Sequence, residues 1–502
     1  MKALGSLTSL VLLGALTSLS GCQENLPPPV EPVPPPAESV LLPPPDPMGE
    51  RPKLDAARGF EPAAPEVFKA PNGMTVWLLE RHALPLVSVS IAVPYGSAHD
   101  PKDQAGLAHI TADMMDEGAG KRSALELSTA INDLGAQIGV GASVSGSVAQ
   151  LSVLKKNFRQ GFDILADVVA RPRFDAKEWK RVSALWKNDL KKRPEEPVAV
   201  SRLVMSAALF SPESPYGHPA DGFVGTAAKI GLPAVKAFHS THWRPDQATL
   251  TIAGDITRAE ITEAINASLG AWKTPKNDAP PVKLAISRRA TLPRIVLVDR
   301  PDAPQSVIAV MREGVTADAP EAPILDLVNT ALGGSFTSRL NQDLREDHGW
   351  TYGARSTFVE LKGRGMFYAS CSVVTEATGQ ALSAMIADLD KMATGGLDAG
   401  ELDKVKAQDR ADLVQTYESL GGITGRLAKL SMLGLPPGFD AAASKKRQAA
   451  TLEELKTLAG AVSPKGATIV VVGPRETVTK QLEVAGLGAP ELWDAEGSPI
   501  KK

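Results

Sequence analysis

The chain has 502 residues, of which 43% are hydrophobic and 22% charged, an ordinary composition for a globular protein of two or more domains. Its formal net charge of −3 shows no excess of basic residues of the kind that binds nucleic acid. We therefore expect no nucleic-acid partner.

Residues 1–22 have the features of a signal peptide. Lys2 precedes a Ser- and Gly-rich apolar run that is short for a membrane span and ends in "LSGC" at residues 19–22. This ending resembles the bacterial lipobox, whose cleavage would leave Cys22 as a lipidated N-terminus. The alternative is an ordinary signal peptide with an incidental cysteine. Because Gln23 rather than an aspartate follows, the resemblance implies an outer-membrane anchor that faces the periplasm of a bacterial cell envelope.

Residues 23–61 are expected to form a proline-rich tether, with eleven prolines between residues 27 and 48. Proline fixes φ and removes a backbone donor, so this segment should be an extended spacer. Only one other cysteine is present, Cys371 in "MFYASCSVV". Its alternating apolar pattern predicts a strand with Cys371 in the core. With Cys22 acylated, no intrachain disulfide could form.

The first half of the ordered chain mixes predicted strands and helices. Extended β-rich patterns occupy residues 73–80 and 86–96, and helical patterns occupy residues 105–118, 123–142 and 178–194. In the first of these helices, Leu107, Ile110 and Met114 have the spacing of a core-facing stripe. The opposite face of that helix would carry the following residues: His109, Ala112, Asp113 and Asp116.

Two similar segments indicate an internal duplication. "PDQATLTIAGDITRAEI" starts at Pro245, and "PKGATIVVVGPRETVTK" starts 219 residues later at Pro464. Residues 274–294 have the composition of a linker between the copies, and a helix is predicted over residues 322–334 of the second copy. The predicted fold is α+β, with two duplicated domains that are each an antiparallel-rich β-sheet covered by helices. The domain boundaries are residues 62–280 and 281–485, followed by a tail at 486–502.

Residues 109–113 follow the frame of an inverted zinc-protease motif, H-x-x-E-H, without completing it. His109 occupies the position of the first ligand, whereas Ala112 replaces the glutamate base and Asp113 replaces the second histidine. In the second half, "LGGSFTSRLNQDLREDHGWTYGARS" looks like a Gly-rich helix start followed by L-R-E-x-x-G-x-x-Y. With the duplication and the segment "FSPESPYGHPADGFVG", the chain resembles the pitrilysin/insulinase family of zinc metallopeptidases, the group that includes mitochondrial processing peptidase.

The resemblance covers residues 62–485 and has different consequences for the two halves. In the family, an arginine and a tyrosine seven residues later reach the zinc site and hold the substrate, and these are Arg345 and Tyr352 here. The family's third zinc ligand is a glutamate on a later helix, and Asn188 and Asp189 stand near that place. The positions His109, Ala112, Asp113 and Asn188 are therefore interpreted as vestigial, with no metal bound by this chain.

The leading hypothesis is a zinc-less lipoprotein subunit that binds peptide substrate through Arg345 and Tyr352 for a partner, a zinc-bearing insulinase-family peptidase. A phenolic or guanidinium donor can stabilise the charge that builds on the scissile carbonyl oxygen. One alternative is an envelope scaffold or peptide-binding protein without a proteolytic role. Another is an active zinc metalloendopeptidase that uses His109, Asp113 and Asp189 as non-standard ligands.

Overall fold

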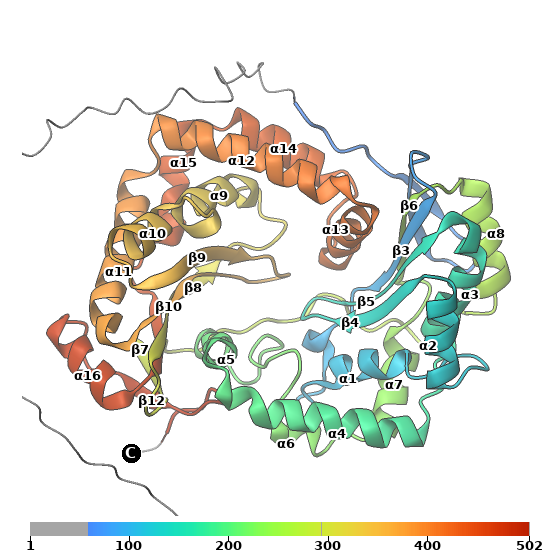
Figure 1. The fold of residues 1–502 in the computed structure, drawn as a ribbon, viewed down its shortest axis with the longest axis horizontal. Helices are drawn as coiled ribbons and strands as arrows, with labels where there is room; N and C mark the ends of the chain where they lie inside the picture. The colour runs from blue at the N-terminus through green and yellow to red at the C-terminus, as the bar shows by residue number, and fades with distance from the viewer. Residues whose placement is uncertain (1–58, 293, 501–502) are drawn as a thin grey trace, which may run out of the picture. The chain divides into compact units, whose positions relative to one another are not determined.

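Two six-stranded β-sheets organise the part of the chain that the computed structural model describes, residues 59–292 and 294–500 (Figure 1). The first sheet has the order β1-β2-β6-β3-β5-β4 and consists of β1 (Glu66–Lys69), β2 (Thr75–Glu80), β6 (Thr249–Gly254), β3 (Leu86–Val93), β5 (Ser147–Leu154) and β4 (Gln137–Ala142). The second has the order β12-β7-β11-β8-β10-β9 and consists of β12 (Glu491–Trp493), β7 (Ile295–Asp299), β11 (Thr468–Gly473), β8 (Gln305–Gly314), β10 (Gly365–Val374) and β9 (Thr351–Val359).

The last five positions in the two strand orders match strand for strand, which confirms the predicted duplication. β2 and β6 are parallel, as are β7 and β11, and every later pair in each order is antiparallel. β6 and β11, the strands of the two similar sequence segments, occupy the same place in their sheets. The predicted α+β class, with two antiparallel-rich sheets covered by helices, is confirmed.

Helices cover both sheets. Those of the first half are α1 (Leu107–Met115), α2 (Ala124–Asp133), α3 (Phe158–Ala170), α4 (Ala176–Lys192), α5 (Pro197–Leu209), α6 (Val224–Ala227), α7 (Leu232–His242) and α8 (Arg258–Leu269). Those of the second half are α9 (Ala322–Asn329), α10 (Arg339–Asn341), α11 (Thr378–Gly395), α12 (Ala399–Glu418), α13 (Leu420–Leu433), α14 (Phe439–Ala449), α15 (Leu452–Leu458) and α16 (Arg475–Val484). Two π-helical segments, η4 (Thr330–Gly334) and η5 (Gln342–Asp347), continue α9 and α10.

Local sequence explains where several of these helices begin and end. α2, α8, α12 and α15 each begin at a capping box, in which the N-cap side chain and a glutamate three residues later satisfy each other's backbone N–H groups. The helix predicted over residues 123–142 is shorter than expected, because Gly135 adopts a left-handed φ of 57° just beyond α2. The glycine-rich remainder of that segment forms the edge strand β4 instead.

The two halves exchange covering helices. α13 from the second half packs on β3 and β6 of the first sheet, where its Ile423 and Leu427 join Trp77 in a buried cluster (Figure 1). α5 from the first half packs on β8 and β11 of the second sheet, where its Val204 joins a buried cluster with Val470. The segment from Gly59 onward consequently forms one compact unit.

Two further segments bear on the sequence analysis. β12, which lies within residues 486–502, pairs in parallel with β7 and buries Trp493, so this part of the chain belongs to the second sheet. Cys371 lies on β10 as a free thiol and is 6% exposed, in agreement with its predicted core position. The signal peptide, Cys22 and most of the tether lie outside the described residues. In the described part of the chain, no helix is long and apolar enough to cross a membrane.

Candidate functional site

Arg345 and Tyr352 lie on consecutive elements of the second half. Arg345 belongs to η5, and Tyr352 is the second residue of β9, at the free edge of its sheet. The buried Asn341 amide joins these two elements. Its Nδ2 donates to the Ala354 carbonyl oxygen at 2.9 Å, and its Oδ1 accepts from the Ala354 N–H at 2.9 Å. This pair of hydrogen bonds fixes the start of β9 against the helix that carries Arg345.

The turn between Arg345 and Tyr352 is also held in place. The Nδ1 atom of His348 lies 2.9 Å from the Oδ1 atom of Asp343, and the imidazole stacks on Trp350 with ring centroids 4.1 Å apart. The arginine and the tyrosine are therefore presented by a braced turn.

The Arg345 guanidinium is packed but retains an unused donor. Its Cζ lies 4.2 Å from the ring centroid of Phe336, a cation–π distance, and its Nε lies 3.5 Å from Oε1 of Glu346. Its Nη1 is buried and has no hydrogen-bond partner among residues 59–292 and 294–500. A buried donor without a partner is costly, so this atom favours an incoming acceptor.

Two aromatic side chains of this region are largely exposed. Phe336 is 69% exposed and Tyr352 is 92% exposed, unusually high values for large hydrophobic side chains. A guanidinium donor with a flat ring packed on it can receive a peptide carbonyl and an apolar side chain.

The first-half positions have a different arrangement. On α1, the core prediction is confirmed, because Leu107, Ile110 and Met114 are all at most 3% exposed. Of the residues assigned to the opposite face, Ala112 is also buried, at 1% exposed.

His109 and Asp113 form an ion pair one helical turn apart, with 3.3 Å between Nε2 and Oδ2. Burial raises the pKa of the Asp113 carboxyl, an effect that the nearby His109 opposes. On α4, Asn188 and Asp189 are exposed, and no hydrogen bond or ion pair within the described ranges links them to His109 or Asp113.

This donor set does not fit a zinc centre built on three ligands and a base. A search of the described residues for three or more His, Cys, Asp or Glu side chains able to hold a metal ion finds none. Two other side chains of α4 contact the region around α1. Arg181 pairs with Glu117, and Trp186 donates its indole N–H to the Asp221 carbonyl oxygen at 2.9 Å beside Gly106.

Two family models match this chain in consecutive segments. The model described as "Insulinase (Peptidase family M16)" matches residues 75–214, and the model described as "Peptidase M16 inactive domain" matches residues 229–408. Together they span more than half of the sequence. The chain belongs to the insulinase family, M16.

Similar proteins agree with this assignment to family M16. The uncharacterized zinc protease YmxG of Bacillus subtilis is 23% identical over 362 residues, which cover 72% of this chain and 87% of YmxG. The crystal structure of a peptidase M16 inactive domain from Pseudomonas fluorescens matches with a TM-score of 0.75 and 24% sequence identity. The match covers 82% of this chain and 98% of the chain in that structure. A protease structure from Helicobacter pylori has a TM-score of 0.74 and 18% identity, with coverage of 82% and 99%. The structural likenesses establish the M16 fold.

Sequence reasoning singled out Arg345 and Tyr352 in this M16 chain but missed two residues beside them. Phe336 lies within the Gly-rich segment, and its place under the guanidinium depends on the path of the chain through η4 and α10. Asn341 gave no signal beyond being a polar residue in a helical pattern. Its full burial and its reciprocal bonds to Ala354 become visible only in the fold.

Proposed function

We propose that this insulinase-family chain is a zinc-less subunit that binds peptide substrate through Arg345 and Tyr352 and presents it to a zinc site on a partner peptidase. The observation that carries the proposal is the unpartnered, buried Nη1 of Arg345, whose guanidinium packs on the exposed Phe336 ring. The first-half helix contributes only the His109–Asp113 ion pair at the corresponding motif. The chain thus offers substrate-binding groups without a zinc-ligand set of its own.

The chemistry of peptide hydrolysis explains how this pair could act. Negative charge builds on the scissile carbonyl oxygen in the transition state, and preorganised donors lower the energy of that state. The Arg345 guanidinium is a planar set of donors, and its packing on Phe336 reduces the freedom it must lose on binding. The Tyr352 hydroxyl is a second donor on a mostly solvent-exposed ring.

The edge position of β9 supports a peptide as the ligand. Among the described residues, β9 pairs as a strand only with β10, and the Asn341 amide bonds the Ala354 N–H and C=O, so a peptide strand would pair with other residues of that outer edge. An extended peptide can add to such an edge as a further strand. Its side chains would then alternate beside Tyr352.

The proposal includes a place in the cell. The "LSGC" ending at residues 19–22 supports lipidation at Cys22 and anchoring of the chain to the envelope, with the outer membrane as the expected site. The zinc of the pair would belong to the partner chain. A scaffold without a proteolytic role predicts a different outcome in the experiment below.

The test begins with a gentle purification of the intact chain from its native envelope and identification of every chain that accompanies it. The proposal expects a stoichiometric companion with an intact H-x-x-E-H motif. Recovery of the chain alone, or with unrelated envelope proteins, would support the scaffold instead.

The second step measures peptide hydrolysis by the reconstituted pair. Arg345→Ala and Tyr352→Phe should each lower kcat by about 10- to 1000-fold, the range for losing one transition-state donor. Arg475→Ala is the matched control, because Arg475 is an exposed arginine on α16, outside the η5–β9 region, and its side chain has no recorded partner in the described structure. Wild-type turnover in the Arg345→Ala pair, or an equal loss in the control, would refute the assigned role.

A further inference from the structure

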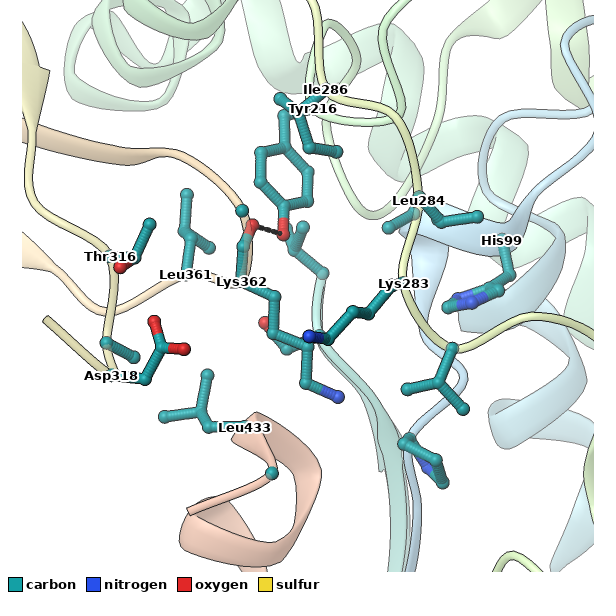
Figure 2. A pocket seen from close by; sticks show the side chains of 18 residues that line it. His99, Tyr216, Lys283, Leu284, Ile286, Thr316, Asp318, Leu361, Lys362 and Leu433 are labelled. Atoms are coloured by element: carbon teal, nitrogen blue, oxygen red, sulfur yellow. Dashed lines mark hydrogen bonds between the residues drawn. The ribbon is translucent and has the colours of Figure 1, made fainter.

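A second candidate site lies in a cavity where the two halves and their linker meet, away from the η5–β9 turn (Figure 2). Its volume is about 580 Å³, within the range of small-molecule sites. The first half contributes the segment around His99, the linker contributes residues 282–286, and the second half contributes residues 316–318, 361–363 and 433–434.

The linker does not cross this cavity freely, because first-half side chains hold it in place. The Tyr95 hydroxyl donates to the Pro280 carbonyl oxygen at 3.0 Å, and Nε2 of His99 lies 3.2 Å from the Pro281 carbonyl oxygen. On the opposite side, the Tyr216 hydroxyl donates to the Lys362 carbonyl oxygen at 2.6 Å. The cavity is therefore built from braced backbone.

Most of the wall is apolar. Leu284 and Ile286 from the linker lie opposite Leu361 and Leu433 from the second half, and Val144 completes the surface. Each methylene group of a ligand buried here would tighten binding about fourfold. This surface fits a hydrocarbon chain or a leucine-like side chain.

Two amines interrupt the apolar wall. Lys283 extends from the linker and Lys362 from the second half, and Figure 2 shows both side chains reaching into the cavity. Neither ammonium group has a hydrogen bond or an ion pair with any residue in the described ranges. Burial lowers the pKa of Lys362 to about 8, as expected for an amine removed from water without an anion beside it.

The remaining titratable groups of the lining fix its net charge. Burial lowers the pKa of His99 to about 4, so that imidazole is neutral at pH 7. Asp318 also lines the cavity, from a different side, and its carboxylate forms no ion pair with either lysine. With both amines protonated and Asp318 ionised, the lining carries one net positive charge. A singly charged anion matches that balance better than a doubly charged phosphate.

We propose that this cavity binds a carboxylate attached to an apolar chain, with the ammonium groups of Lys283 and Lys362 on the carboxylate and the chain against the leucine wall. Two sources share this chemistry, a free fatty acid and the C-terminal residue of a peptide. The proposal requires no partner chain and is independent of the role of Arg345.

The experiment is calorimetric titration of the full chain with two matched ligand pairs. The first pair is octanoate and octanol, and the second is an acetylated Ala-Leu-Leu peptide with a free or an amidated C-terminus. The proposal expects one carboxylate to bind at least about tenfold more tightly than its neutral counterpart, the effect of charge-assisted hydrogen bonds. Preference for octanoate identifies a fatty acid, and preference for the free peptide identifies a peptide terminus. Absence of binding by both carboxylates, or equal binding by the neutral ligands, would overturn the proposal.

Variants test the lysines directly. Lys362→Met and Lys283→Met keep the apolar stems and should each weaken carboxylate binding about tenfold. Asp318→Asn removes the opposing charge and should tighten binding. Lys465→Met, an exposed lysine outside the cavity, is the control and should leave the affinity unchanged. Thermal unfolding of each variant verifies folding, and unchanged affinity in folded Lys362→Met and Lys283→Met proteins would contradict the assignment.

Discussion

The exchange of helices between the halves can be tested with Leu427→Ala in α13. Leu427 is 1% exposed and packs in the cluster that joins α13 to the first sheet. The substitution removes three buried carbon atoms, which costs about 2.4 kcal/mol at about 0.8 kcal/mol each. The residual cavity adds about 1 kcal/mol more, and alanine brings no helix-propensity cost. We therefore expect the free energy of unfolding to fall by about 3–4 kcal/mol.

Urea denaturation followed by tryptophan fluorescence measures this loss, because Trp77 lies in the same buried cluster and is 7% exposed. Leu185→Ala is the matched control, since Leu185 on α4 is 53% exposed and the same atoms are removed. The free energy of unfolding of the control variant should fall by less than about 1 kcal/mol. If the two variants lose equal stability, α13 does not contribute the packing energy inferred here, and the coupling of the halves through this helix is refuted.

Two further predictions concern titration and backbone geometry. Burial lowers the pKa of His239 to about 4, so the unfolded chain takes up a proton below about pH 6.5 that the folded chain excludes. This group should consequently contribute a loss of about 2 kcal/mol of stability between pH 7 and pH 5, and in urea denaturation His239→Phe should lose less stability than the wild type over that interval by this amount; an equal loss in both proteins would contradict the prediction. Gly254 has a φ of 135°, and a Cβ there would strike the Leu86 carbonyl oxygen, whereas a Cβ on the duplicated Gly473 would meet only side-chain atoms, those of Ser306 and Val478. Gly254→Ala should therefore lower the free energy of unfolding by about 2 kcal/mol or more, and Gly473→Ala should lower it clearly less. Equal shifts of the urea midpoint in the two variants would argue against this difference.

The sequence was sufficient to predict the fold class, because the strand patterns and the duplicated segments are local signals. It could not assign the covering helices. On β3, the alternation of apolar residues with Ser88 and Ser90 suggests one buried and one open face, yet both serines are at most 4% exposed. The second face is closed by α13, where the Thr424 and Ser88 hydroxyl groups share a 2.8 Å hydrogen bond. Contacts between residues more than 300 positions apart leave no periodic trace in a single sequence.

The candidate site was predictable to a similar extent. The resemblance of one continuous segment to the insulinase-family motif identified Arg345 and Tyr352 as a pair. The packing of Phe336 and the buried, unpartnered Nη1 atom depend on the π-helical turn η5, which the ordinary helical pattern does not reveal. The lysine cavity was not predictable, because its two amines come from the linker and from the second half.

The duplicated topology gives a reason why the two motifs can diverge independently. The incomplete zinc motif lies on α1, the first α-helix after β3. The strand equivalent to β3 in the second sheet is β8, and the first α-helix after β8 is α9. Arg345 lies on η5, which directly precedes β9. The strand equivalent to β9 in the first sheet is β4, and the helix before β4 is α2. The two motifs therefore occupy non-equivalent helices of equivalent sheets. Loss of the ligand positions around His109 removes nothing that supports the η5–β9 turn, because Asn341 braces that turn within the second half. The zinc motif in one half can therefore change without disturbing the turn that carries Arg345 in the other.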